Sequence, residues 1–303
     1  MFHKSIFLLG SSLALFLLSH ACSGNQAAPS TRQVQDANAE IEANILKLKE
    51  AKQKLSADPN DQAALSVILK LLKDANAINR SNAAAVLGEA GEEHGEVIKA
   101  SAVPMLIEMI ESGDEGDQYA ALKALRGFGP HATAAIPILK KILLSPNSQQ
   151  AWLAAETLGR MKAAAHDAVS NLLNAIKTRK SECRNDELHI CRFAIQALGS
   201  IGPAAIAAKA DLISLLADAN PFLRSYAAVA LIRIQPDARE AVQAIGSLLA
   251  NTNVEVRRRT IWELRDIGRE ARPVASSVRT ALRDQDEPVR RAASELLESL
   301  SDQ

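Results

Sequence analysis

The sequence is poor in aromatic residues, poor in cysteine and without net charge. Phe, Trp and Tyr make up 3% of the 303 residues, only three residues are cysteine, and 35 Lys and Arg balance 35 Asp and Glu. Residues 251–303 hold ten arginines, but they also hold ten acidic residues. Because a surface that tracks phosphates needs excess positive charge, we do not expect nucleic acid as a partner.

Regular alternation of apolar and polar residues over β-branched runs is also missing, which argues against a sheet protein. Alanine, leucine and isoleucine are abundant instead. These residues favour helices, and alanine lets helices pack closely. The fold class that we expect is therefore all-α.

No motif of a known catalytic chemistry is present, since GxSxG, HExxH and the kinase motifs are all missing. Glu92-Glu93-His94-Gly95-Glu96 has side chains that could bind a metal, but we interpret this stretch as a solvated acidic loop. Gly127-Phe128-Gly129 ends a predicted helix rather than following a strand, so the context of a phosphate-binding loop fails. The sequence predicts no catalytic residue, no metal site and no cofactor.

The N-terminal stretch, residues 1–21, has the layout of a secretory signal peptide. Lys4 supplies a positive charge, an apolar run covers residues 6–18, and Ser19 and Ala21 are small. This run is short for a membrane span, which needs about 20 residues. A buried first helix is the alternative, but the run has no polar face. We expect residues 1–21 to be removed on export.

The junction at Cys22 resembles the lipobox of bacterial lipoproteins, in which the cysteine becomes the lipid-modified first residue. The motif usually has leucine three places earlier, where this sequence has Ser19; cleavage that leaves a free Cys22 is the alternative. Residues 22–32 are polar and small, as in a flexible tether. The resemblance implies a lipid anchor on Cys22 in the bacterial periplasm, and Ser23 implies the outer membrane.

A repeat covers most of the remaining chain. When the sequence is compared with itself, seven leucines align: Leu87, Leu125, Leu158, Leu198, Leu231, Leu264 and Leu297. The intervals between successive leucines are equal, except that those after the first and the third leucine are longer. Each unit predicts a helix, a turn and a second helix. In the fourth unit these are residues 190–201, the Gly202-Pro203 stop, and residues 204–216.

The units resemble HEAT repeats of the short kind whose signature runs VRxxAAxALGxIG, then AIPxL. Val256-Arg257 and Val289-Arg290 match the first step, residues 197–202 match ALGxIG, and residues 135–139 match AIPxL. The resemblance implies a right-handed α-solenoid of six to seven helix pairs over residues 74–303. Phycobilin lyases carry similar units, so a chromophore lyase is one alternative function and a nucleic-acid-binding array is another.

Residues 31–73 precede this array and predict two helices, over residues 31–56 and 63–73. An approximate heptad spacing of apolar residues in the first helix allows two interpretations. The pair could cap the first repeat, which solenoids require, or the first helix could form a coiled-coil contact with a partner. We favour an N-terminal helical cap.

By resemblance to HEAT arrays, the arginines of the VR step should form a structural ladder with acidic or amide groups of neighbouring units. These arginines are Arg80, Arg224, Arg257 and Arg290. Gln118, Ala151 and Cys191 take the same place in units two to four. The ladder is therefore predicted to be interrupted in the middle of the array.

Two insertions explain the two longer intervals. Residues 91–101 lie between the two helices of the first unit, and residues 177–189 lie between the third and fourth units, where we expect loops. Cys183 and Cys191 bracket the second insertion, and in an exported protein they predict a disulfide. Zinc is less suitable because a structural site needs four ligands and only His189 is near.

The function that we expect is a non-catalytic scaffold that binds a protein or peptide in the cell envelope. The binding surface would be concave and lined by the second helices of the units. We predict these partner-binding residues: Lys140, Asn171, Asn174, Lys177, Gln243 and Arg279. We expect most of the aromatic side chains on the first helices, Trp152, Phe193, Tyr226 and Trp262, to fill the core.

Overall fold

The computed structural model describes residues 30–180 and 189–301, and every regular element within them is a helix. The expected all-α repeat array is confirmed. Residues 1–47 and residues 48–303 form two compact units, and only the second contains repeats. The signal peptide, most of the tether, Cys22 and Cys183 lie outside the described residues.

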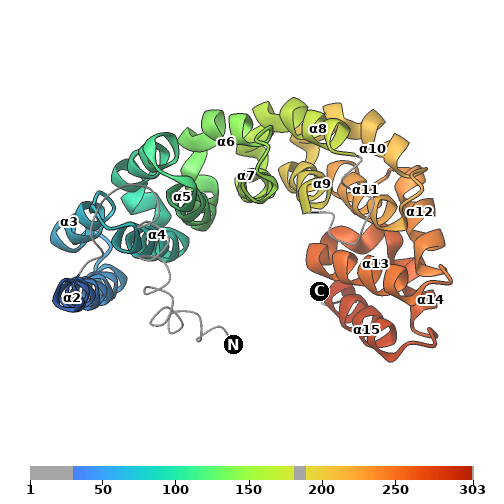
Figure 1. Cartoon of the computed structure of the whole chain (residues 1–303). Coiled ribbons are helices and arrows are strands. Elements are labelled where there is room, and N and C mark those ends of the chain that lie inside the picture. Colours follow the sequence, from blue (N-terminus) through green and yellow to red (C-terminus); the bar gives the residue numbers. More distant parts are fainter. Residues whose placement is uncertain (1–29, 181–188, 302–303) are drawn as a thin grey trace. The chain divides into compact units, whose positions relative to one another are not determined.

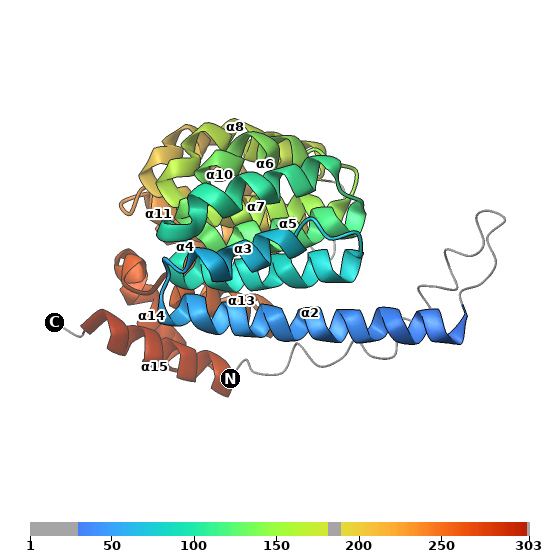
Figure 2. The same cartoon turned by 90° about the vertical axis from the view of Figure 1, so that its left-hand side faces the viewer.

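The array begins with three helices of unequal length. Helix α2 is Thr31–Ala57, a single long helix (Figure 2). Helix α3 is Gln62–Leu71, and it packs against α4, which is Ala77–Ser112. Helix α4 contains both helices of the first repeat, which meet at a kink at His94.

The next five repeats each consist of a first helix, a 3-10 or coil connection and a second helix, and the last unit contributes a first helix, α15. The first helices are α5 (Glu115–Phe128), α7 (Ser148–Arg160), α9 (His189–Ile201), α11 (Pro221–Ile234), α13 (Val254–Ile267) and α15 (Glu287–Ser301). The second helices are α6 (Ile136–Ile142), α8 (Val169–Thr178), α10 (Lys209–Leu215), α12 (Arg239–Leu249) and α14 (Ala275–Ala281). Short 3-10 helices precede four of these: η1 (Gly129–Ala135), η2 (Lys162–Ala168), η4 (Gly202–Ala208) and η5 (Gly268–Val274).

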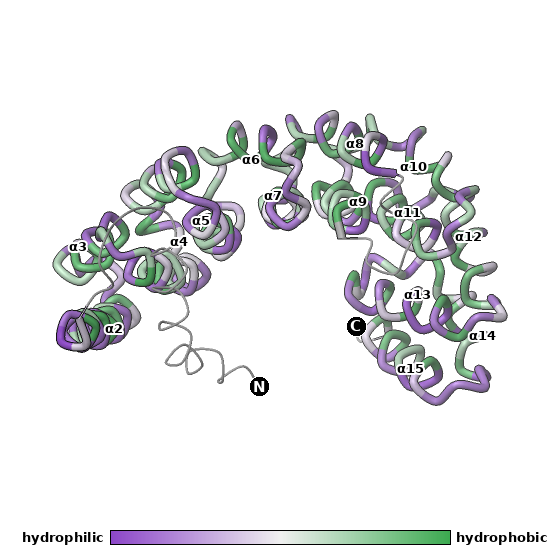
Figure 3. Tube along the Cα trace, in the orientation of Figure 1, coloured by the Kyte–Doolittle hydropathy of each residue, from purple (hydrophilic) through white to green (hydrophobic). Residues whose placement is uncertain are grey.

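Within residues 48–303 these helices form two layers (Figure 1). Each first helix from α7 to α13 packs against the first helix before it and the one after it, and the second helices lie on one side of this row. The aligned leucines of units one to six are all fully buried. Every helix has both hydrophobic and hydrophilic residues (Figure 3), as expected where one face of each helix is buried.

The ends of the first helices follow from the repeated sequence. Asn or Asp caps most of their N-termini; Asn220, for example, accepts a hydrogen bond from the Phe222 backbone N–H at 2.9 Å. At the C-terminal end, Gly202 has a φ of +72°, in the left-handed region that glycine favours. The same place in the third unit is Lys162, with a φ of 54°. It is the only described residue other than glycine with a positive φ.

Small residues bring neighbouring first helices close together. A Cβ added at Gly199 would lie 2.9 Å from the Cα of Ala230, and one at Gly159 would lie 3.0 Å from the Cα of Ala197. These contacts join α7 to α9 and α9 to α11. In the unit of α11, Ile232 stands where the first, third and fourth units have this glycine, so this contact is not repeated between α11 and α13.

The first insertion is helical, which corrects the expectation of a loop. Residues 91–101 continue α4, with a local departure from helical geometry at His94 (φ −136°, ψ 25°). Gly91 faces the next repeat, because a Cβ there would lie 2.6 Å from the Phe128 ring. The glycines therefore serve close packing, and the glutamate, lysine and alanine between them favour a helix.

The four ladder arginines make one shared set of hydrogen bonds. In each, Nη1–H donates to the backbone carbonyls five and six residues earlier; Arg224 reaches Asp218 O at 2.7 Å and Ala219 O at 3.1 Å. The other three make the same pair of bonds. Arg80 also binds Asp117 of the next unit at 2.8 Å, and Arg257 binds Asp284 at 2.7 Å. Gln118, which replaces arginine in the second unit, donates to Gly113 O at 3.3 Å.

One described stretch, Ile190–Leu215, is long and apolar enough to cross a membrane by length and composition. In the structure this stretch consists of α9, η4 and α10. These elements pack against α7, α8 and α11 within the array. Half of the apolar window is buried there, which accounts for its hydrophobicity.

Candidate functional site: a groove on the first-helix layer

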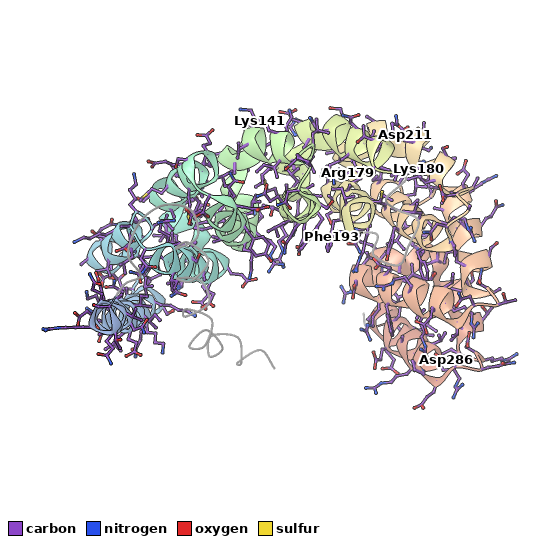
Figure 4. The ribbon with its side chains drawn as sticks, in the orientation of Figure 1. Lys141, Arg179, Lys180, Phe193, Asp211 and Asp286 are labelled. Atoms are coloured by element: carbon purple, nitrogen blue, oxygen red, sulfur yellow. The ribbon has the colours of Figure 1, made fainter. Side chains whose placement is uncertain are left out.

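A groove with a volume of about 430 Å³ lies on the first helices of units three to six. Its lining residues come from α7, α9, α11 and α13, together with Lys162 just after α7. No residue of a second helix lines it. This differs from the expectation that the second helices provide the binding surface. Phe193, one of the lining residues, lies on the face of the row of first helices that points away from α8 and α10 (Figure 4).

Helix α11 lies between α9 and α13, so it is buried on nearly all sides. Tyr226 and Ala230 are among its buried residues, and both line the groove. A hydrogen bond joins the two flanking helices: Gln196 Nε2 on α9 donates to Glu263 Oε2 on α13 at 2.7 Å. This bond links units that are two repeats apart, and it fixes the position of both side chains in the groove.

Glu263 is an unusual residue for its place. It stands directly before the aligned leucine, where the other units have Val86, Ala124, Thr157, Ala197, Ala230 and Leu296. It is only 5% exposed. Burial raises the pKa of the Glu263 carboxyl above its ordinary value of 4.5, although the Gln196 hydrogen bond and the charges of Arg192 and Arg259 act in the opposite direction. The groove therefore holds a carboxyl group whose charged form is disfavoured.

Arg192 lies beside Glu263 and is held mainly by aromatic rings. Its guanidinium carbon is 5.3 Å from the centre of the Phe193 ring and 5.8 Å from that of the Tyr226 ring. Its Nη2 is 3.8 Å from Glu263 Oε1, which is an ion-pair distance but too long for a hydrogen bond. Its Nε is buried without a hydrogen-bond partner among the described residues. The guanidinium is thus positioned while its edge donors are little used.

Two other charged side chains along the groove, Glu156 and Arg233, are paired with groups of the chain. Glu156 accepts from Arg126 Nη1 at 3.0 Å. Arg233 donates to Ser200 Oγ at 3.0 Å and to Glu270 Oε2 at 2.7 Å. Each pair joins neighbouring repeats: the bonds to Glu156 and Ser200 join successive first helices, and Glu270 lies on η5.

Aromatic residues concentrate on the first-helix layer. Both tryptophans and both tyrosines of the chain lie there, Tyr119 on α5, Trp152 on α7, Tyr226 on α11 and Trp262 on α13. The rings of Trp152 and Phe193 stack with centres 5.0 Å apart. The second helices α6, α8, α10, α12 and α14 contain no aromatic residue. Tyr226 is buried, and Trp152 and Phe193 are partly buried against the core, as expected for most of these residues; Trp262 is the exception, at 38% exposed.

The six predicted partner-binding residues all lie on second helices. Lys140 is on α6, Asn171, Asn174 and Lys177 are on α8, Gln243 is on α12, and Arg279 is on α14. None lines the groove. Lys177 forms an ion pair with Asp211 at 2.7 Å. Only the three residues of α8 are brought together on one helix, so the structure does not assemble the six into one site.

The acidic stretch in α4 forms separate pairs. Glu96 binds Lys99 at 2.7 Å and His131 Nδ1 at 2.9 Å, and these contacts lower the pKa of the Glu96 carboxyl. Glu93 accepts from Ser56 Oγ at 3.1 Å, and Glu92 lies 3.5 Å from Arg160. Within residues 30–180 and 189–301, no three His, Cys, Asp or Glu side chains form a group that could hold a metal ion.

The predicted cysteine sites lie mostly beyond the described ranges. Cys191 is fully buried on α9 and is disulfide-bonded. Cys183, its predicted partner, lies outside the described residues, so this pairing stays a prediction. Cys22 also lies outside them, and the lipid anchor stays a prediction as well.

Sequence reasoning missed the three residues at the centre of the groove, Arg192, Gln196 and Glu263. One signal was available in the repeat alignment: Glu263 occupies a position at which every other unit has an apolar residue, a small residue or threonine. A charged residue at such a place is expected to have a specific partner. The alignment could not show that this partner lies two repeats away.

Comparisons with known proteins agree with this architecture. The model of the HEAT repeats family matches residues 65–159 and 210–298. An engineered protein of known structure is 19% identical, with a TM-score of 0.52, and the match covers 94% of this chain and 77% of that one. The complex of CpcE and CpcF of phycocyanin lyase from Nostoc sp. PCC7120 is 20% identical, with a TM-score of 0.52, and the match covers 78% of this chain and 94% of that one.

The search of curated proteins gives no match. The low identities to the two solved structures show a shared fold and carry no activity from those proteins to this one. The family model is more specific, because it covers more than half of the sequence and matches both ends of the array. The chain therefore belongs to the HEAT-repeat family.

Proposed function

We propose that this protein is a non-catalytic scaffold that binds a protein or peptide along the first-helix layer, at the groove between α7 and α13. The observation that carries the proposal is the set of arginine and aromatic side chains that line this groove: Arg160, Arg192, Arg233, Phe193 and Tyr226. Trp, Tyr and Arg are the residues that most often dominate binding energy at protein interfaces. On this chain both tryptophans and both tyrosines are on the helices of that layer.

The size and rigidity of the groove fit a peptide segment. A volume of about 430 Å³ accommodates a few side chains rather than a whole domain. The Gln196–Glu263 hydrogen bond and the Trp152–Phe193 stack order the lining residues before a partner arrives. Such pre-ordering favours binding, because little side-chain entropy is lost on association.

The proposed place of action is the bacterial cell envelope. Residues 1–21 have the layout of a signal peptide, and Cys22 follows small residues as in lipoproteins. A multiply acylated cysteine would hold the protein at a membrane. Intact-mass measurement of the mature protein and of Cys22→Ala tests this part. A diacylglyceryl-sized increment lost in the variant supports it, and an unmodified mature chain or retention of residues 1–21 contradicts it.

Photo-cross-linking in the producing cells tests the binding role. The photoreactive residue p-benzoylphenylalanine would replace Phe193 in the groove or, as the control, Leu282 at the end of α14, which is 42% exposed. The proposal expects one discrete cross-linked protein from position 193 and none from position 282. Cross-linking only from position 282, or from neither position, would overturn it.

A further inference from the structure

We infer that the groove recognises an acidic segment of the partner, with Arg192 binding a carboxylate and Lys162 supplying a second positive charge. The inference rests on the proposed function and names the chemistry of the partner. Three features carry it: the state of Arg192, the backbone of Lys162, and the pairing of the acidic residues in the groove.

Arg192 is held differently from the ladder arginines and from the arginines that bind carboxylates of the chain. The ladder arginines use their donors on backbone carbonyls, and Arg126, Arg233 and Arg258 donate to carboxylates of the chain. Arg192 is instead packed against two rings, with a third of its side chain exposed. Its Nε is buried and its Nη2 is too far from Glu263 for a hydrogen bond, so the Nη groups are the donors left for a planar carboxylate of the partner.

Lys162 occupies a backbone conformation that glycine takes in three other units. Gly129, Gly202 and Gly268 stand at this place, and all have a positive φ. A lysine there is strained, because its Cβ crowds the neighbouring carbonyl. Its side chain is exposed and lines the groove, and no ion pair involving Lys162 occurs within the described ranges. A positive charge is therefore kept at the groove at the expense of local backbone geometry.

The acidic residues of the groove are mostly engaged within the chain. Glu156 is bound by Arg126, and Glu263 accepts from Gln196 while being almost fully buried. Asp266 belongs to α13, whereas Arg160 and Lys162 lie at the end of α7, on the opposite flank of the lining. The α7–α9 part of the groove is thus the part that an acidic segment fits best.

Selection from a random peptide display library tests the inference, with the full chain as bait. Peptides that bind the wild-type protein but not Phe193→Ala are the groove-binding ones, and they should be enriched in Asp and Glu. Their affinity for Arg192→Gln should fall by about tenfold or more, as for an arginine at the centre of an interface. Arg279→Gln, on a second helix, is the matched control and should bind as wild type.

Lys162→Gly separates binding from folding. Glycine relieves the strained backbone, so this variant should unfold at a higher urea concentration and yet bind the acidic peptides about threefold more weakly, as for loss of one rim charge. Groove-binding peptides without acidic enrichment, or affinities unchanged in both variants, would overturn the inference but not the proposed function. Failure to select any groove-binding peptide would count against both.

Discussion

The two helix layers of this array share one core and have different exposed faces. The first helices α5 to α15 carry both tryptophans, both tyrosines, the ladder arginines beyond Arg80 and the groove. The second helices α6 to α14 carry no aromatic residue, and their exposed side chains include short polar ones such as Asn174 and Gln243. Stability requires similar packing from both layers, so the difference between them points to recognition rather than folding.

The difference also explains why the fold is easier to derive than the site. Core positions recur at the same interval in most units, so each unit supports the interpretation of the next. The groove depends on Glu263 and Lys162, which depart from the repeat and each occur once, and on Arg192, whose place is also arginine in units six and seven. Such departures are visible only after the repeat is known.

Core truncations should have the largest effect, and the effect should be alike in both layers. Leu198 on α9 and Leu212 on α10 are both fully buried. Replacing either by alanine should lower the free energy of unfolding by about 2–5 kcal/mol, since it removes buried methyl groups and leaves a cavity. Urea unfolding followed by circular dichroism measures this. If only the Leu198→Ala variant lost free energy of unfolding, the claim that both layers share one core would be contradicted.

Loss of a ladder arginine should be the next largest effect. The side chains of Arg257 and Asp284 are only 14% and 7% exposed, and their ion pair is 2.7 Å long. Arg257→Ala should lower the free energy of unfolding by about 3 kcal/mol, because it leaves the Asp284 charge without its partner. Arg279→Gln on the second layer should change it by less than about 0.5 kcal/mol. Equal losses in the two variants would contradict the structural role of the ladder.

Substitutions at the helix ends should have smaller effects of opposite sign. Lys162→Gly should raise the free energy of unfolding by about 1 kcal/mol, and Gly202→Ala should lower it by a similar amount, since only glycine accepts the left-handed region without strain. Urea unfolding at constant ionic strength compares the two. A destabilised Lys162→Gly would show that the lysine is held by favourable contacts, and the strain argument would fail.

The smallest effect should come from Glu263, and it should depend on pH. Its folded-state pKa is raised above 4.5, so ionisation at neutral pH opposes folding. Glu263→Gln should therefore be more stable than wild type at pH 7, and the gap should close as the pH falls toward 4.5 and Glu263 takes up a proton. Arg192, Arg259 and Asp266 are the charged groups around it. If the difference in free energy of unfolding between Glu263→Gln and wild type grew as the pH fell, the folded state would stabilise the ionised carboxylate instead.

Sequence reasoning predicted the helical repeat, the capping of its turns and the arginine positions, because these follow from local chemistry repeated many times. It placed residues 91–101 in a loop, although their helix-forming residues continue α4 and their glycines pack on Phe128 and His131. It predicted a binding surface on the second helices and did not foresee the groove on the first helices. The periodic pattern shows which face of a helix is buried, but not on which side of the stacked pairs side chains enclose a groove.

The central claim, that the first-helix layer is the binding face, is tested most directly by hydroxyl-radical footprinting of the protein with and without a selected peptide. The account predicts that Trp152 and Phe193 lose reactivity on binding. Leu144 after α6 and Leu282 at the end of α14, which are 49% and 42% exposed, should react as before. Protection of Leu144 and Leu282 with unchanged reactivity of Trp152 and Phe193 would contradict the account.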